Sequence, residues 1–120
     1  MDVFVRPGDS IWYYSQTFKL PLPLIVDSNP NINTQALKLN QIIKIPGYVS
    51  NQYTIQRGDS IWVIAQRINM PPDAIFLLNP TLIPNRLQVG QVIELPVRVT
   101  WSVVNGKRNY DYSTMINDIS

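Results

Sequence analysis

Apolar residues occur along the chain in two arrangements, one typical of strands and one typical of amphipathic helices. Segments 3–5 and 53–55 are short and alternating, which predicts a strand with one buried face at each place. A helical stripe follows each strand, with apolar or small residues at positions i, i+3, i+4 and i+7, and each stripe should face a core. The stripes consist of Ile11, Tyr14, Ser15 and Phe18, and of Ile61, Ile64, Ala65 and Ile68.

The same pattern occurs twice, because residues 3–46 match residues 53–96 without a gap when the chain is shifted by 50 residues. Of these 44 aligned positions, 14 are identical, so the chain contains an internal repeat. A match without gaps implies that both copies share one backbone. The identical residues of the first copy are Gly8, Asp9, Ser10, Ile11, Trp12, Gln16, Pro21, Ile25, Asn29, Pro30, Leu37, Gln41, Ile43 and Pro46.

Glycine and proline mark the ends of the first expected elements. Gly8 and Gly58 allow a tight turn after the first strand, and the Asp and Ser residues that follow can cap a helix. Prolines within 21–23 and 71–72 end this helix and begin a second, brief helix. The second helix should end at the Asn-Pro pairs 29–30 and 79–80, since a proline disfavours helical angles in the preceding residue.

A final strand closes each copy. Its inward-facing residues are Ile43 and Ile45, or Ile93 and Leu95 in the second copy, and Pro46 and Pro96 are expected to end it. Asn40 stands where the second copy has Gly90, which predicts a left-handed backbone there. The order strand, helix, helix, strand predicts an α+β fold, in which each copy has a two-stranded antiparallel sheet with two helices on one face.

Composition excludes several functions. The net charge is +2, from ten basic and eight acidic residues without a basic run, so we expect no nucleic-acid partner. No apolar run is long enough to span a membrane, so we expect no membrane partner either. The chain has no cysteine and no histidine, which argues against a catalytic site, a metal site or a cofactor. No signal peptide is visible, because the first residues lead directly into the first strand.

The repeated motifs resemble tandem LysM domains. The second copy carries Gly58-Asp59-Ser60-Ile61-Trp62, then Asn79-Pro80, then Leu87-x-Val89-Gly90-Gln91-x-Ile93-x-Leu95-Pro96, in the order and spacing of that family. The resemblance covers residues 1–97 and gives a first module at 1–48 and a second at 51–97. It implies binding of glycans that contain N-acetylglucosamine, in peptidoglycan or chitin, and therefore a location in the bacterial cell wall or the spore cortex or coat.

The resemblance also implies where the glycan binds, in a shallow groove between the loop after the first strand and the loop after the second helix. Turns can supply the N–H, C=O and small apolar contacts that an N-acetyl group needs. In the first copy these residues are Gly8, Asp9, Ser10 and Ile11, with Asn29, Pro30, Asn31 and Ile32. In the second copy they are Gly58, Asp59, Ser60 and Ile61, with Asn79, Pro80, Thr81 and Leu82.

Several of these residues also have a structural interpretation. Asp9 and Asp59 are expected to act first as helix caps, and Ile11 and Ile61 to lie mainly in the core. Trp12 and Trp62 could stack on sugars, but their position favours partial packing against the module. Asn31, Ile32, Thr81 and Leu82 have no evident packing role, which makes them the preferred glycan contacts. Residues 47–52 are expected to form a short linker.

The last residues, 98–120, lie outside the repeat. An alternating segment at 98–104 predicts another strand before an Asn-Gly turn, and residues 110–119 have the spacing of a helix start. This helix start either forms a small helix that caps the second module, or belongs to a further domain. It resembles the beginning of a zinc carboxypeptidase-type domain that cuts the γ-D-glutamyl-diaminopimelate bond of peptidoglycan. An alternative is therefore that the chain targets a following catalytic domain, which cannot lie within residues 1–120 because its zinc ligands include histidine. A spore or wall assembly scaffold is a further alternative.

Overall fold

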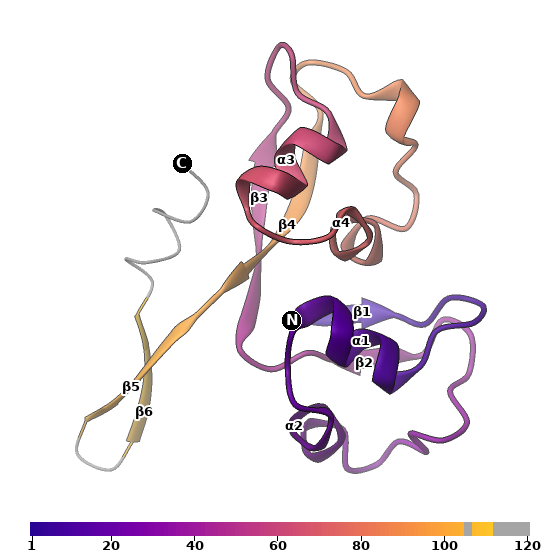
Figure 1. The fold of residues 1–120 in the computed structure, drawn as a ribbon, viewed down its shortest axis with the longest axis vertical. Helices are drawn as coiled ribbons and strands as arrows, with labels where there is room; N and C mark the ends of the chain where they lie inside the picture. The colour runs from indigo at the N-terminus through magenta and orange to yellow at the C-terminus, as the bar shows by residue number, and fades with distance from the viewer. Residues whose placement is uncertain (105–106, 112–120) are drawn as a thin grey trace.

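The computed structural model has the predicted order of strand, helix, helix, strand, twice along the chain (Figure 1). It describes residues 1–104 and 107–111. Module 1 (residues 2–44) consists of β1 (Asp2–Phe4), α1 (Ile11–Phe18), α2 (Leu22–Ser28) and β2 (Ile42–Lys44). Module 2 (residues 48–98) consists of β3 (Tyr48–Thr54), α3 (Ile61–Arg67), α4 (Pro72–Leu78), the 3₁₀ turn η1 (Pro84–Arg86) and β4 (Val92–Arg98).

Each module contains a two-stranded antiparallel sheet with its helices on one face. β1 pairs with β2, so that Val3 lies opposite Ile43, and β3 pairs with β4 in the same sense. Val3 and Ile43 point inward and are buried with the helix stripe, whereas the neighbouring pair Phe4 and Ile42 is exposed on the outer face. The predicted α+β fold is thus confirmed.

The predicted starts and turns are also present. Ser10 and Ser60 cap α1 and α3, each side chain accepting a hydrogen bond from the backbone N–H three residues later, at 3.0 Å and 3.1 Å. Asn40 has a φ of 63° and the equivalent Gly90 a φ of 90°, as the left-handed prediction requires. The helix starts and the left-handed turn are therefore determined by the chemistry of the local residues in both copies.

The segment predicted as a linker is part of a strand. Residues 48–52 belong to β3, which pairs with β4 over seven residues, and Ser50 lies opposite Pro96. The prediction that Pro96 ends the last strand is therefore wrong. Proline cannot donate a ladder hydrogen bond, but both strands of a two-stranded sheet have a free edge where that donor is not needed. Only residues 45–47 separate β2 from β3, so no long linker lies between the modules.

The residues after β4 form a hairpin. β5 (Thr100–Val104) pairs with β6 (Lys107–Asp111), and the hairpin extends away from both modules in Figure 1. The strand expected at 98–104 is divided between β4 and β5. Residues 110 and 111, expected to begin a helix, lie in β6 instead, since they pair with β5. The rest of that helix, 112–119, lies outside the described residues.

Module 2 packs on module 1 through one face of α4. Ala74 and Leu77 are buried in the hydrophobic core of module 1, and α4 contacts β1 and α1. The equivalent residues of α2 are Leu24 and Asp27, which are exposed. The two second helices therefore share a backbone but differ on this face, because only α4 has a module to pack against.

Tyr48 forms a second contact between the modules, in addition to α4. Its hydroxyl donates a hydrogen bond to the carbonyl of Phe18 at 2.7 Å, and the two rings meet edge to face at 5.4 Å. Arg98, at the end of β4, lies over the Tyr48 ring and donates to its hydroxyl at 3.0 Å. The first residue of β3 thus attaches to module 1, and the last residue of β4 supports that tyrosine.

Leu77→Ala tests this shared core. We expect the variant to lose about 3 kcal/mol in the free energy of unfolding, because a fully buried leucine leaves a cavity between the modules. Leu24→Ala, at an exposed site of α2, should lose less than about 0.5 kcal/mol. Urea denaturation followed by circular dichroism measures both. Equal losses in the two variants would contradict the packing of α4 on module 1.

Candidate binding loops

The first loop of each module begins with a tight turn. Gly8 has a φ of 83° and Gly58 a φ of 86°, and nothing lies within 4 Å of where a Cβ would stand at either glycine. Backbone conformation, and not crowding, is therefore what requires glycine. The turns are closed by N–H groups of Asp9 and Asp59, each 3.1 Å from the carbonyl oxygen three residues earlier.

The aspartates of this loop close the turn and do not cap the helix. Asp9 accepts from the backbone N–H of Arg6 at 3.0 Å and from the hydroxyl of Tyr14 at 2.9 Å. Asp59 accepts from the backbone N–H of Gln56 at 2.8 Å. Only 6% of either aspartate side chain is exposed, so neither carboxylate is available to a ligand. The prediction that they act first as helix caps is wrong, because Ser10 and Ser60 take that role.

The ionisation of Asp59 is controlled by its surroundings. Burial opposes ionisation, but hydrogen bonds from the Tyr53 hydroxyl, at 2.6 Å, and from the Gln56 N–H outweigh it. The positive charge of Arg67 adds to them, so the pKa of Asp59 lies below its ordinary value. The carboxylate that braces this turn is therefore ionised near neutral pH.

The asparagines of the second loop are also structural. The Asn29 amide donates to the carbonyls of Ile25 and Lys44, at 2.7 Å and 2.9 Å, and accepts from the Lys44 N–H at 2.8 Å. Asn79 forms the equivalent three hydrogen bonds in module 2. These side chains connect the end of the second helix to the last strand. Their amide N–H and C=O groups are therefore already bonded within the module and are not available to a sugar.

The tips of the second loops are accessible. The N–H of Ile32 donates to the Asn29 carbonyl at 3.2 Å, so the two residues between them, Pro30 and Asn31, lie exposed at a turn. Module 2 exposes Pro80 and Thr81 in the same way. The expectation that Ile32 and Leu82 have no packing role is wrong, since both are half-buried against the core of their module.

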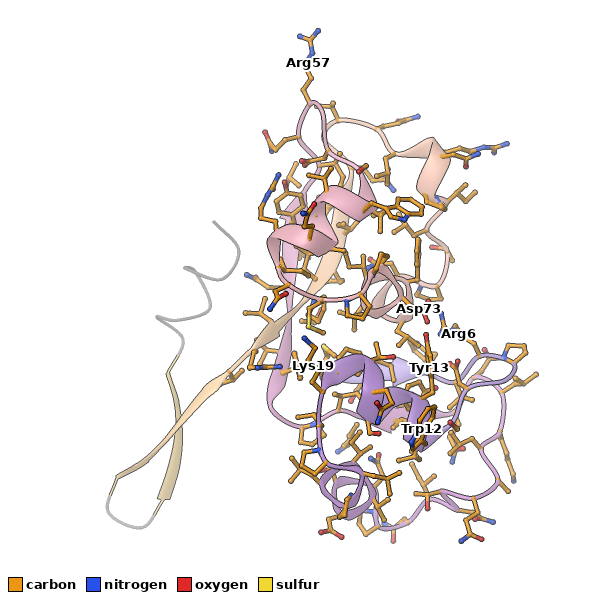
Figure 2. The ribbon with its side chains drawn as sticks, viewed as in Figure 1. Arg6, Trp12, Tyr13, Lys19, Arg57 and Asp73 are labelled. Atoms are coloured by element: carbon orange, nitrogen blue, oxygen red, sulfur yellow. The ribbon has the colours of Figure 1, made fainter. Side chains whose placement is uncertain are left out.

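The helices beside the loops place one residue inward and the next outward. Ile11 and Ile61 are buried, as predicted, so only their backbone could contact a ligand. Trp12 and Trp62 are 63% and 58% exposed. Figure 2 shows Trp12 projecting from α1 on the side away from Asp73. Partial packing, the predicted arrangement, is limited for both tryptophans, because they stand on the outer side of the first helical turn.

Trp62 has one aromatic neighbour in its module. Its ring meets that of Phe76, on α4, edge to face at 6.5 Å. α4 leads directly into the second loop, and α3, which carries Trp62, directly follows the first loop. Each module therefore exposes a turn, a loop tip and one large aromatic side chain.

The most informative residues missing from the sequence-based site are those that join the modules. Arg6 and Tyr13 of module 1 both donate hydrogen bonds to Asp73 of module 2. In the other copy the positions of these three residues hold Gln56, Val63 and Pro23. The sequence signal for these residues is that they are polar and differ between the two copies. A contact between the modules involves each copy differently, so its residues are not repeated.

Apart from Arg57, which is exposed beside Gly58 in the first loop of module 2, the accessible groups of the loops are neutral and non-nucleophilic. They comprise turn backbone, amide and hydroxyl side chains, proline and indole, which suit hydrogen bonding and apolar contact with an uncharged ligand. No group of three acidic, histidine or cysteine side chains gathers among the described residues to hold a metal ion. None of the helices in the described part of the chain is long and apolar enough to cross a membrane. The fold and loops thus define a tandem of small binding modules.

Comparison with known proteins identifies the family. The LysM domain profile matches residues 4–46 and 53–96, which together make up most of the chain. The chain belongs to the LysM domain family, and each module corresponds to one LysM domain.

Relatives carry the same modules in longer proteins. The gamma-D-glutamyl-L-diamino acid endopeptidase 1 of Lysinibacillus sphaericus is 73% identical over 119 residues, which span 99% of this chain and 30% of that protein. A LysM domain from Volvox carteri chitinase is 54% identical, covering 40% of this chain and 98% of that structure with a TM-score of 0.39. The spore cortex-lytic enzyme SleL of Bacillus megaterium is 27% identical, covering 79% and 22%, with a TM-score of 0.38.

Asp59→Asn tests the bracing of the loop in module 2. We expect a loss of about 2 kcal/mol in the free energy of unfolding at pH 7, the scale of hydrogen bonds to a charged group. Because the folded pKa lies below the ordinary value of 3.8, the stabilisation is fully present above that pH and is lost as the pH falls through the folded pKa. The difference from wild type should therefore be constant between pH 5 and pH 7 and shrink below about pH 4.

Thermal unfolding followed by circular dichroism across this pH range measures the difference. Asp27→Asn, at an exposed position of α2, is the control and should follow wild type. A difference that grows on acidification would contradict the assignment.

Proposed function

We propose that the chain binds N-acetylglucosamine-containing glycan without cleaving it and so holds a larger protein on the bacterial cell wall. The observation that carries this proposal is the duplication of one set of exposed neutral groups, turn, loop tip and indole, on two modules of the LysM family. An N-acetyl group offers one amide and one methyl, which these groups match without any charged partner.

Peptidoglycan is the proposed glycan, and a peptidoglycan-cleaving enzyme the proposed larger protein. The support comes from the relative that is 73% identical, which its name describes as an endopeptidase acting at a gamma-D-glutamyl-L-diamino acid bond. The chain spans less than a third of that protein, so the cleaving part lies beyond the matched region. We place the protein in the cell wall, with the spore cortex as a more specific location.

Two weak grooves suit this role. A single shallow site on a hydrated sugar is expected to bind near millimolar concentration, equivalent to about 4 kcal/mol. When one groove is occupied, the other meets the same polymer at a high effective concentration. Because a shared core joins the modules, this gain depends on a fixed arrangement and not on a flexible linker.

The double variant Asn31→Ala with Thr81→Ala tests the loop tips. Each single change should weaken pelleting with insoluble peptidoglycan roughly fivefold, the loss of one hydrogen bond of about 1 kcal/mol. The double change should weaken it roughly 25-fold, because both grooves bind one polymer. Asn85→Ala, at an exposed position of η1, is the control. A folded double variant that pellets like wild type would remove these residues from the site.

Peptidoglycan and chitin beads used in parallel separate the glycans. Stronger retention on peptidoglycan supports the proposed location, and equal retention would limit the proposal to N-acetylglucosamine polymers in general. A chain that binds neither polymer would leave the assembly-scaffold alternative.

Trp12→Ala with Trp62→Ala tests the aromatic faces. We expect binding to fall at least tenfold, because each indole offers its face to the apolar side of a sugar ring, at about 1 kcal/mol per module. The melting temperature should change by only a few degrees, since both side chains are largely exposed. Leu39→Ala with Val89→Ala is a matched control, because these residues are also exposed, apolar and equivalent in the two copies. Equal binding losses in the two double variants would show a general loss of apolar surface instead of stacking.

A further inference from the structure

The first binding loop is braced differently in the two modules. In module 2, Asp59 accepts from the Tyr53 hydroxyl at 2.6 Å and pairs with Arg67 at 3.5 Å, both within the same module. The equivalent positions of module 1 hold Val3 and Thr17, which supply neither a phenol nor a guanidinium. In module 1 the phenol comes from Tyr14, whose hydroxyl donates to Asp9 at 2.9 Å, and the guanidinium comes from Arg6.

Arg6 differs from Arg67 because it holds two carboxylates at once, one in each module. Its Nε and Nη2 donate to Asp9 at 3.0 Å and 3.1 Å, within the first loop of module 1. Its Nη1 and Nη2 donate to Asp73, on α4 of module 2, at 2.8 Å each. Figure 2 shows Arg6 and Tyr13 pointing toward Asp73 across the boundary between the modules. A planar guanidinium held on both sides has little freedom to rotate.

Asp73 is itself firmly placed. It stands in the first turn of α4, next to Ala74, which is fully buried in the core of module 1. The Tyr13 hydroxyl donates to the same carboxylate. The hydrogen bonds from Arg6, opposed by burial, hold the pKa of Asp73 below its ordinary value, so the pair is ionised at neutral pH.

These contacts form a connected path from α4 through Asp73 and Arg6 to Asp9. We propose that module 2 positions the first binding loop of module 1 by holding Arg6 through Asp73, whereas Arg67 in module 2 bonds Tyr53 and Asp59 of its own module. The groove of module 1 then reaches its full affinity only while α4 is docked, and Arg6 and Asp73 are positioning residues for glycan binding. This inference rests on the proposed function.

The consequence is an asymmetric tandem. A loop ordered in advance loses less conformational entropy on binding, so removing its brace weakens binding without removing any ligand contact. The coupling between two sites is commonly worth fivefold or more in affinity. Loss of Asp73 should therefore weaken the groove of module 1 by about fivefold and leave that of module 2 unchanged.

The test measures each groove separately in the intact chain. A soluble β-1,4-linked tetramer of N-acetylglucosamine is titrated into the ¹⁵N-labelled protein, and dissociation constants are taken from the amide shifts of Gly8 and Gly58. Asp73→Ala should raise the constant of module 1 by about fivefold and that of module 2 by less than twofold. Asp73→Asn keeps an acceptor for Tyr13 and Arg6 and should restore part of the affinity. Arg67→Ala, the matched control, should weaken module 2 alone.

Each outcome decides the inference. If both modules of the wild-type chain bind the tetramer and Asp73→Ala leaves the affinity of module 1 unchanged, the coupling is overturned but the proposed function stands. Equal weakening of both modules by Asp73→Ala overturns the asymmetry. An absence of shifts in wild type overturns the proposed function and the inference with it. Circular dichroism establishes that each variant is folded, and a loss of affinity in module 1 of a folded Asp73→Ala supports the inference.

Discussion

Burial of Ala74 and Leu77 in the core of module 1 is the interaction on which the remaining structure depends. A unit of some forty residues buries too little apolar surface to be strongly stable alone, and this chain has no disulfide to compensate. Docking of α4 enlarges the core of module 1. It also brings Asp73 within reach of Arg6. Tyr48, at the start of β3, bonds α1 of module 1 as well, so the short connection between the modules is held at both contacts.

Much of the fold could be predicted because its determinants are local. A positive φ at Gly8 and at Asn40, the serine caps and the helical stripes each follow from the chemistry of a few neighbouring residues. The strand through Pro96 could not be predicted, because its pairing with Ser50 joins residues far apart in sequence. Residues 110 and 111 have helical spacing but lie in a strand, which again reflects pairing with a distant partner.

The candidate site was predicted less completely, and the reason is physical. A sequence motif identifies residues that occur together. It does not distinguish residues that stabilise a loop from residues that the loop exposes to a ligand. Asn29 and Asn31 illustrate this difference, since one amide is fully bonded within the module and the other is free of the core. The position of Trp12 after a buried residue predicts packing, yet the helix directs its side chain outward.

The difference between Asp27 and Leu77 has a consequence for the order of the modules. These residues occupy the same place on equivalent helices, but one faces water and the other a neighbouring core. Exchanging the two modules in sequence would bury a carboxylate and leave a leucine in solvent. The tandem therefore has a polarity: its copies are alike in fold but not interchangeable, and an array lengthened by repeating module 1 would lack the face that joins each module to the one before it.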